Sequence, residues 1–219
     1  MPWGFCRGLR RCSWESRRPA AACPTPGARS SCPQSGPAWT SARACTPYAG
    51  PIRVDANTGL SPGEALAILP ELERLGVELI EQLFPARRLD QLRWLPEWSS
   101  LPIVADESAV AIEDLEGLVG IVAGVNIEFA KCGGVGPARR MLARAQELGF
   151  RTFLGCMEET SAGIAASAAV APLADWVDLD GCLLLAEDPF TGLELGPDKR
   201  WMLSGRPGLG LARAGRDGV

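Results

Sequence analysis

Three acidic residues recur at nearly one interval: Asp55, Glu81 and Asp106 lie 26 and 25 residues apart, and Lys131 follows 25 residues later. Each comes at the end of an apolar run typical of a β-strand, the last of them expected over Val125–Lys131. One strand, one helix and two short connections take about that many residues. In successive parallel strands the four side chains therefore fall at one end of the sheet, which is the mouth if the sheet forms a barrel. Three carboxylates suit a hard divalent cation, and a neighbouring lysine can move protons.

The composition restricts the chemistry and the partners. The 219 residues include no histidine, so the commonest general base and zinc ligand are absent. A formal charge of −4 indicates no nucleic-acid partner. No apolar stretch has the length of a membrane span, and the first residues lack the apolar core of a secretory signal. We therefore expect a cytoplasmic protein without a membrane partner.

Residues 1–50 differ in composition from the rest of the chain. They contain no Ile, Val or Asp, but seven Arg and seven Pro. Burial of so few large aliphatic side chains cannot offset the entropy lost when the backbone is ordered. We therefore predict that residues 1–50 are a disordered or non-native segment. A disulfide or zinc module is disfavoured because its five cysteines are odd in number and irregularly spaced. The abrupt change also motivates the hypothesis of a wrong-frame translation joined to a genuine downstream gene.

From Ile52 onward, strands alternate with helices. The first helix has Ser61 as predicted N-cap, Pro62 at its first position, Glu64 as capping-box acid and Gly76 as its end. Further helices are predicted over 89–98, 112–119, 137–148 and 161–173, and further strands over 151–155 and 176–179.

This order predicts an α/β fold, a partial TIM-type (β/α) barrel of about six βα units over residues 51–211. Residues 212–219 are predicted to be a disordered tail. A complete barrel has eight strands, so we expect the first barrel strands to be missing.

Several motifs carry a resemblance to a known family. The earlier ones are Val54–Asn57, Ile80–Gln82, Val104–Ser108 and Ala130–Gly134, and the later ones are Gly155–Ser161, Asp178–Gly181, Leu183–Leu185, Asp188–Phe190 and Pro207–Gly210. Together they resemble the enolase superfamily, in the branch of mandelate racemase and muconate lactonizing enzymes. The later motifs are similar to those of dipeptide epimerases. The resemblance runs from about residue 52 to 211 and does not extend before it.

The resemblance implies a metal centre and a base. Asp55, Glu81 and Asp106 would hold one Mg²⁺, which would neutralise the charge that develops on the substrate carboxylate when the adjacent carbon loses its proton. Lys131 would be the base. It must be neutral to accept the proton, and a nearby dication lowers the pKa of a lysine in the required direction.

The resemblance also implies a dipeptide site. Asp178 and Asp180 would receive the α-ammonium of the dipeptide, and we expect both on one face of a strand because they alternate. Glu159 falls where the family keeps an acid near the substrate, and Met157 lies in the same motif.

Two features depart from the family. Epimerization uses bases on both faces of the α-carbon, and the family carries the second in an upstream Lys-x-Lys motif, yet this chain has no lysine before Lys131. We also expect the α+β capping domain of the family to be missing. We therefore expect Mg²⁺-dependent epimerization of a dipeptide that is impaired in this truncated chain. Alternatives are a non-catalytic barrel remnant or another racemase or lactonizing reaction of the same branch. The identity of the dipeptide and a homo-oligomeric state stay open.

Overall fold

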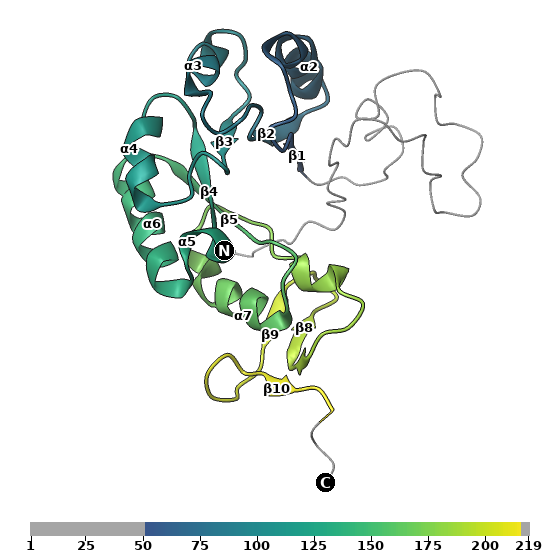
Figure 1. Ribbon diagram of the computed structural model, residues 1–219. Coiled ribbons are helices and arrows are strands. Elements are labelled where there is room, and N and C mark those ends of the chain that lie inside the picture. Colours follow the sequence, from purple (N-terminus) through teal and green to yellow (C-terminus); the bar gives the residue numbers. More distant parts are fainter. Residues whose placement is uncertain (1–50, 216–219) are drawn as a thin grey trace, which may run out of the picture. The chain divides into compact units, whose positions relative to one another are not determined.

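The computed structural model describes residues 51–215 (Figure 1). The interpretations of residues 1–50, as disorder, as a cysteine module or as a wrong-frame product, lie outside the described residues, as does the tail from 216 to 219. The described chain forms two compact units, an N-terminal unit of residues 51–101 and a C-terminal unit of residues 102–215.

The N-terminal unit consists of two strand–helix repeats. Strands β1 and β2 pair in parallel, as expected for strands joined by a crossover helix. Leu69, Leu72 and Leu79 are among its fully buried side chains. The elements are β1 (Ile52–Asp55), α2 (Pro62–Arg74), β2 (Val77–Glu81), α3 (Leu89–Leu92) and the 3₁₀ turn η1 (Leu95–Glu97).

The start of α2 follows the prediction made from its sequence. The Ser61 hydroxyl accepts a hydrogen bond from the backbone N–H of Glu64, and the Glu64 carboxylate accepts one from the Ser61 N–H at 2.8 Å. This reciprocal pair is a capping box and satisfies two N–H groups that a helix start leaves unpaired. Gly76 has a left-handed φ of 68° just after the helix, a conformation that glycine adopts without strain.

The C-terminal unit contains four parallel strands that pair in sequence order. Helix α6 packs against β4 and β5 and contacts α7 (Figure 1). The parallel strands are β3 (Ile103–Ala105), β4 (Gly124–Glu128), β5 (Arg151–Gly155) and β6 (Trp176–Val177). The intervening helices and turns are η2 (Ile112–Asp114), α4 (Leu115–Leu118), α5 (Phe129–Cys132), α6 (Val135–Glu147), α7 (Ser161–Val170), η3 (Ala171–Leu173) and η4 (Gly181–Leu184).

Short antiparallel pairs follow the parallel strands. β7 (Phe190–Thr191) pairs with β10 (Ala212–Arg213), and β8 (Leu193–Leu195) pairs with β9 (Trp201–Leu203). The tail predicted from residue 212 therefore begins with a paired strand, and its first residues are ordered. No helix within the described residues has the length and apolar character needed to cross a membrane.

Within residues 51–215, the six strands β1–β6 run parallel to their paired neighbours and alternate with helices, so the predicted α/β fold is confirmed. Several element ends differ from the prediction. The helix expected over 89–98 is interrupted before η1, because Pro96 has no N–H to continue the helical hydrogen bonds. The expected strand 125–131 ends at Glu128, so Lys131 lies in α5 rather than at a strand end.

Candidate functional site

Asp55 and Glu81 are fixed side by side in the N-terminal unit. They are the last residues of β1 and β2 and are direct partners in the parallel register. Glu81 is only 7% exposed. The Asp55 carboxylate accepts hydrogen bonds from both the backbone N–H, at 2.8 Å, and the side-chain amide of Asn57. The strand pairing therefore places two of the predicted metal ligands side by side at the C-terminal ends of β1 and β2.

The backbone just beyond these two acids is held in an uncommon conformation. Asn57, Thr58 and Gln82 have left-handed φ angles of 44°, 63° and 32°. The Thr58 N–H donates to the Gln82 carbonyl at 2.8 Å, and the Ala56 N–H donates to the Glu81 carbonyl at 3.0 Å. Such conformations cost about 1–3 kcal/mol each and concentrate at functional sites. The strained residues therefore follow closely after Asp55 and Glu81, two of the predicted metal ligands.

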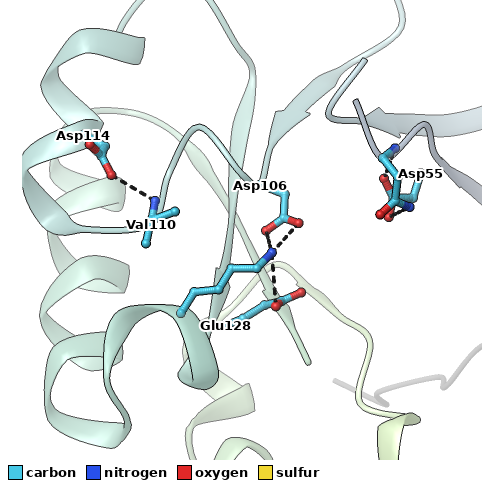
Figure 2. A network of polar contacts seen from close by, with 7 residues as sticks. Asp55, Asp106, Val110, Asp114 and Glu128 are labelled. Carbon is cyan, nitrogen blue, oxygen red and sulfur yellow. Dashed lines mark hydrogen bonds and ion pairs between the residues drawn. The ribbon is translucent and has the colours of Figure 1, made fainter. Parts of the chain in front are cut away.

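Asp106, Lys131 and Glu128 form a charged cluster in the C-terminal unit (Figure 2). Both Asp106 carboxylate oxygens accept hydrogen bonds from the Lys131 ammonium, and a Glu128 oxygen lies 3.2 Å from the same nitrogen. The side chains of the two acids are 8% and 6% exposed, and that of Lys131 is 22% exposed. The structure thus brings two of the predicted site residues, Asp106 and Lys131, into direct contact.

The cluster sets the charge state of Lys131. Burial alone would lower the pKa of Lys131, but the Asp106 carboxylate and then Glu128 outweigh it and raise the pKa above its ordinary value. The ammonium form is therefore favoured at neutral pH in the absence of a metal. A lysine that acts as a base must first lose this proton, so its neighbours have to change for it to serve in that role.

Glu128 was missed by the sequence reasoning. It is the last residue of β4 and lies three residues before Lys131, so the first turn of α5 brings the two side chains together. The regular interval drew attention to Lys131 instead. A signal was present, because Glu128 is the first charged residue after the apolar run that begins at Gly124.

The loop that carries Asp106 is anchored by a second acid. The Asp114 carboxylate accepts a hydrogen bond from the backbone N–H of Val110 at 3.0 Å (Figure 2). It accepts a second from the backbone N–H of Ala111 at 2.8 Å. The Ala109 N–H donates to the Asp106 carbonyl at 2.9 Å. These bonds close a tight turn directly after β3, and this turn restricts the position of the Asp106 side chain.

The predicted substrate acids lie around a buried thiol at the ends of β5 and β6. Burial first, and then the charges of Asp178, Asp180 and Glu159, raise the pKa of Cys156 to about 12. The expectation that Asp178 and Asp180 lie on a strand was wrong, because β6 ends at Val177 and both acids belong to the following loop. The register of β6 with β5 ends at Val177, and the Asp178 N–H makes a further bond to β5, donating to the Leu154 carbonyl at 2.9 Å.

The loops after β5 and β6 approach each other closely at Gly181. Its N–H donates to the Cys156 sulfur at 3.4 Å, and an added Cβ would lie 2.1 Å from the carbonyl oxygen of Met157. Only glycine fits at this approach. The Trp201 indole N–H donates to the Leu179 carbonyl at 2.9 Å and holds the second loop from its other side. Met157, predicted to contact substrate, is 41% exposed on the first loop.

Glu159 lies against the first turn of α7. A Cβ added at Gly163 would come within 1.8 Å of a Glu159 carboxylate oxygen, so the glycine makes room for this side chain. The other carboxylate oxygen is buried without a hydrogen-bond partner among the described residues. Burial raises the pKa of Glu159, partly countered by a backbone hydrogen bond at Met157.

The predicted ligands are divided between the two units, with Asp55 and Glu81 in one and Asp106 in the other. Across residues 51–215, no three or more Asp, Glu, Cys or His side chains are arranged as a ready-made metal site. The convergence of Asp55, Glu81 and Asp106 on one ion therefore stays a prediction. Their donor chemistry fits it, because three carboxylates supply the oxygen ligands that Mg²⁺ prefers.

Comparison with known families gives one match that covers most of the chain. The family described as enolase C-terminal domain-like matches residues 40–214. A protein from Flavobacterium johnsoniae named L-Ala-D/L-amino acid epimerase is 43% identical over 144 residues, which are 66% of this chain and 43% of that protein.

Solved structures agree with this match. A substrate-liganded L-Ala-D/L-Glu epimerase from Bacillus subtilis matches with a TM-score of 0.68 and 31% identity, over 74% of this chain and 47% of that chain. A dipeptide epimerase from Methylococcus capsulatus, complexed with Mg and the dipeptide L-Arg-D-Lys, matches with a TM-score of 0.65 and 37% identity, over 74% and 48% of the two chains. This chain therefore spans about half the length of the proteins that it matches.

Proposed function

This chain belongs to the enolase C-terminal domain-like family, and we propose that it carries the metal and base side of a dipeptide epimerase site. The resemblance to the enolase superfamily and the prediction of a partial TIM-type barrel are confirmed by the comparisons. The observation that carries the proposal is the direct contact between the Lys131 ammonium and both carboxylate oxygens of Asp106.

In this proposal Asp55, Glu81 and Asp106 hold one Mg²⁺. Glu81 and Asp106 are both buried residues, and a buried carboxylate is stable as an anion only beside a cation or hydrogen-bond donors. Bound Mg²⁺ would stabilise the negative charge that builds up on a substrate carboxylate when the neighbouring carbon is deprotonated. The Mg-complexed relative from Methylococcus capsulatus supports the choice of metal.

Lys131 removes the α-proton in this proposal. Its ammonium is held in the protonated state chiefly by Asp106, so any use of that carboxylate by a cation removes the main stabilisation of the proton. After the ammonium has passed its proton to solvent, the neutral Lys131 Nζ accepts the α-proton of the substrate. The Lys131 side chain is 22% exposed.

Asp178 and Asp180 receive the α-ammonium of the dipeptide, with Glu159 and Met157 beside it. The grouping of the three acids around Cys156 supports this assignment, because it concentrates negative charge at adjacent loop ends. The dipeptide named with the Methylococcus capsulatus structure supports the substrate class. A cytoplasmic location and the absence of a nucleic-acid partner stay predictions from the sequence.

A single base limits what this chain does alone. The chain contains two lysines, Lys131 and Lys199, and the second lies in the turn between β8 and β9. We infer exchange of the α-proton of one epimer with solvent, without net inversion, because the opposite face of the α-carbon has no second lysine to return a proton. The alternative is a non-catalytic remnant, which would give no exchange at all.

Deuterium exchange distinguishes a one-base enzyme from a non-catalytic remnant. L-Ala-L-Glu and L-Ala-D-Glu are incubated separately with the protein and Mg²⁺ in D₂O, and loss of the α-proton signal is followed by NMR. We expect exchange in one epimer only, abolished by Lys131→Met and retained by the matched control Lys199→Met. Equal exchange of both epimers, or silence from both, would contradict the proposal.

A further inference from the structure

The Lys131 ammonium has two carboxylate neighbours that differ in position and in strength of contact. Asp106 follows β3 and accepts hydrogen bonds through both oxygens, whereas Glu128 ends β4 and approaches at 3.2 Å. Both acids are buried, with side chains 8% and 6% exposed. The cluster carries one positive and two negative charges, so its net charge is −1 when all three groups are ionised.

The ammonium and a divalent cation would compete for the same oxygens of Asp106. Two cations bound to the same carboxylate repel each other strongly in a partly buried site, where the effective dielectric constant is well below that of water. The ammonium must therefore leave Asp106 or lose its proton when a cation binds there. The second carboxylate within reach of Lys131 Nζ is Glu128, which already lies 3.2 Å from it.

We propose that Glu128 is a positioning residue that receives the Lys131 ammonium when a divalent cation takes Asp106. This inference rests on the proposed metal site. Without metal the ammonium bridges Asp106 and Glu128, and with metal it is held by Glu128 alone. Glu128 acts through Lys131 and does not itself touch the metal, and the exchange forms or breaks no covalent bond.

The experiment is a metal-binding cycle on the full chain. Mn²⁺ serves as the probe, and its affinity is measured by calorimetry and by the loss of the free-ion EPR signal. The variants are Glu128→Gln, Lys131→Met and the double substitution. Because outer partners of metal ligands commonly change affinity by about 10- to 100-fold, we expect Glu128→Gln to weaken binding by about tenfold. In this variant the Lys131 ammonium has only Asp106 as a charged partner, so it competes more strongly with the metal for that carboxylate.

The double variant decides between exchange and direct ligation. Removing the ammonium with Lys131→Met relieves the competition, so we expect tighter binding than in the wild type, and no further effect of Glu128→Gln in that background. A conservative variant, Glu128→Asp, keeps the charge and is expected to retain an affinity close to wild type. Circular dichroism at the same concentrations identifies any variant that has lost its fold.

Each other outcome overturns the inference. Equal weakening by Glu128→Gln with and without Lys131 would mean that Glu128 binds the metal directly. An affinity that Glu128→Gln leaves unchanged in both backgrounds would make Glu128 a structural acid only. A wild-type chain that binds no Mn²⁺ would overturn the proposed function as well, which distinguishes the two failures.

Discussion

The buried thiol of Cys156 gives a quantitative test of how the predicted substrate acids are placed. Cys156 is 4% exposed, and burial together with Asp178, Asp180 and Glu159 raises its pKa from 9.0 to about 12. The folded protein thus keeps a proton that the unfolded chain loses. A raised pKa of this kind contributes stability fully below pH 9.0, and that stability is lost as the pH rises from 9.0 towards 12.

The size of the loss follows from the two pKa values. At pH 10 the thiol is largely ionised in the unfolded chain, and this ionisation lowers the free energy of the unfolded state by about 1.4 kcal/mol. The folded state gains almost nothing, because its thiol stays protonated. By pH 12 the difference approaches about 4 kcal/mol, since each pKa unit corresponds to about 1.4 kcal/mol. Eight cysteines and many other groups also titrate in this range, so only a difference between variants isolates Cys156.

The assay compares urea unfolding of the wild type and Cys156→Ala at pH 8 and pH 10 under reducing conditions. The cost of the smaller alanine side chain is the same at both pH values, so it cancels in the comparison. We expect the disadvantage of the variant to shrink by about 1.4 kcal/mol between pH 8 and pH 10. A difference that stays constant with pH would refute the placement of Cys156 in a buried, acid-lined position.

Two further predictions concern the loops that carry the acids. Gly181→Ala should lower the free energy of unfolding by about 1–3 kcal/mol in a urea titration, because its Cβ would overlap the Met157 carbonyl. The control Gly117→Ala, whose Cβ meets open space in α4, should not destabilise the chain in the same titration. Asp114→Ala should weaken Mn²⁺ binding in calorimetry, because the turn after Asp106 loses the acceptor of two backbone N–H groups; unchanged affinity would show that this turn does not position the ligand.

Local signals predicted the framework of the fold well. The Ser61 capping box and the left-handed Gly76 were specified by neighbouring residues, and both occur as expected. The apolar runs that end at Asp55 and Glu81 predicted strands, and parallel pairing then set these acids in register. These features depend on contacts within a few residues or on a single pairing, which is why a sequence alone suffices for them.

Features that depend on tertiary partners were not predicted. Asp178 and Asp180 alternate as strand residues do, but β6 and its register with β5 both end at Val177. The approach of Gly181 to Met157 likewise has no signal in its own neighbourhood, because the partner lies on another loop. Such features are decided by packing between segments far apart in the sequence.

The regular spacing drew attention to Lys131 but predicted the wrong element for it, a strand end instead of a helix. The strand ends at Glu128, and α5 begins at once, so the additional three residues form a helical turn rather than more strand. That turn folds Lys131 back over Glu128 and still lets its ammonium reach Asp106. α5 is only four residues long and is followed by Gly133 and Gly134 with φ angles of 94° and 102°. A lysine on so short a helix, bounded by left-handed glycines, can change carboxylate partners without disturbing β4, which is what an exchange between Asp106 and Glu128 requires.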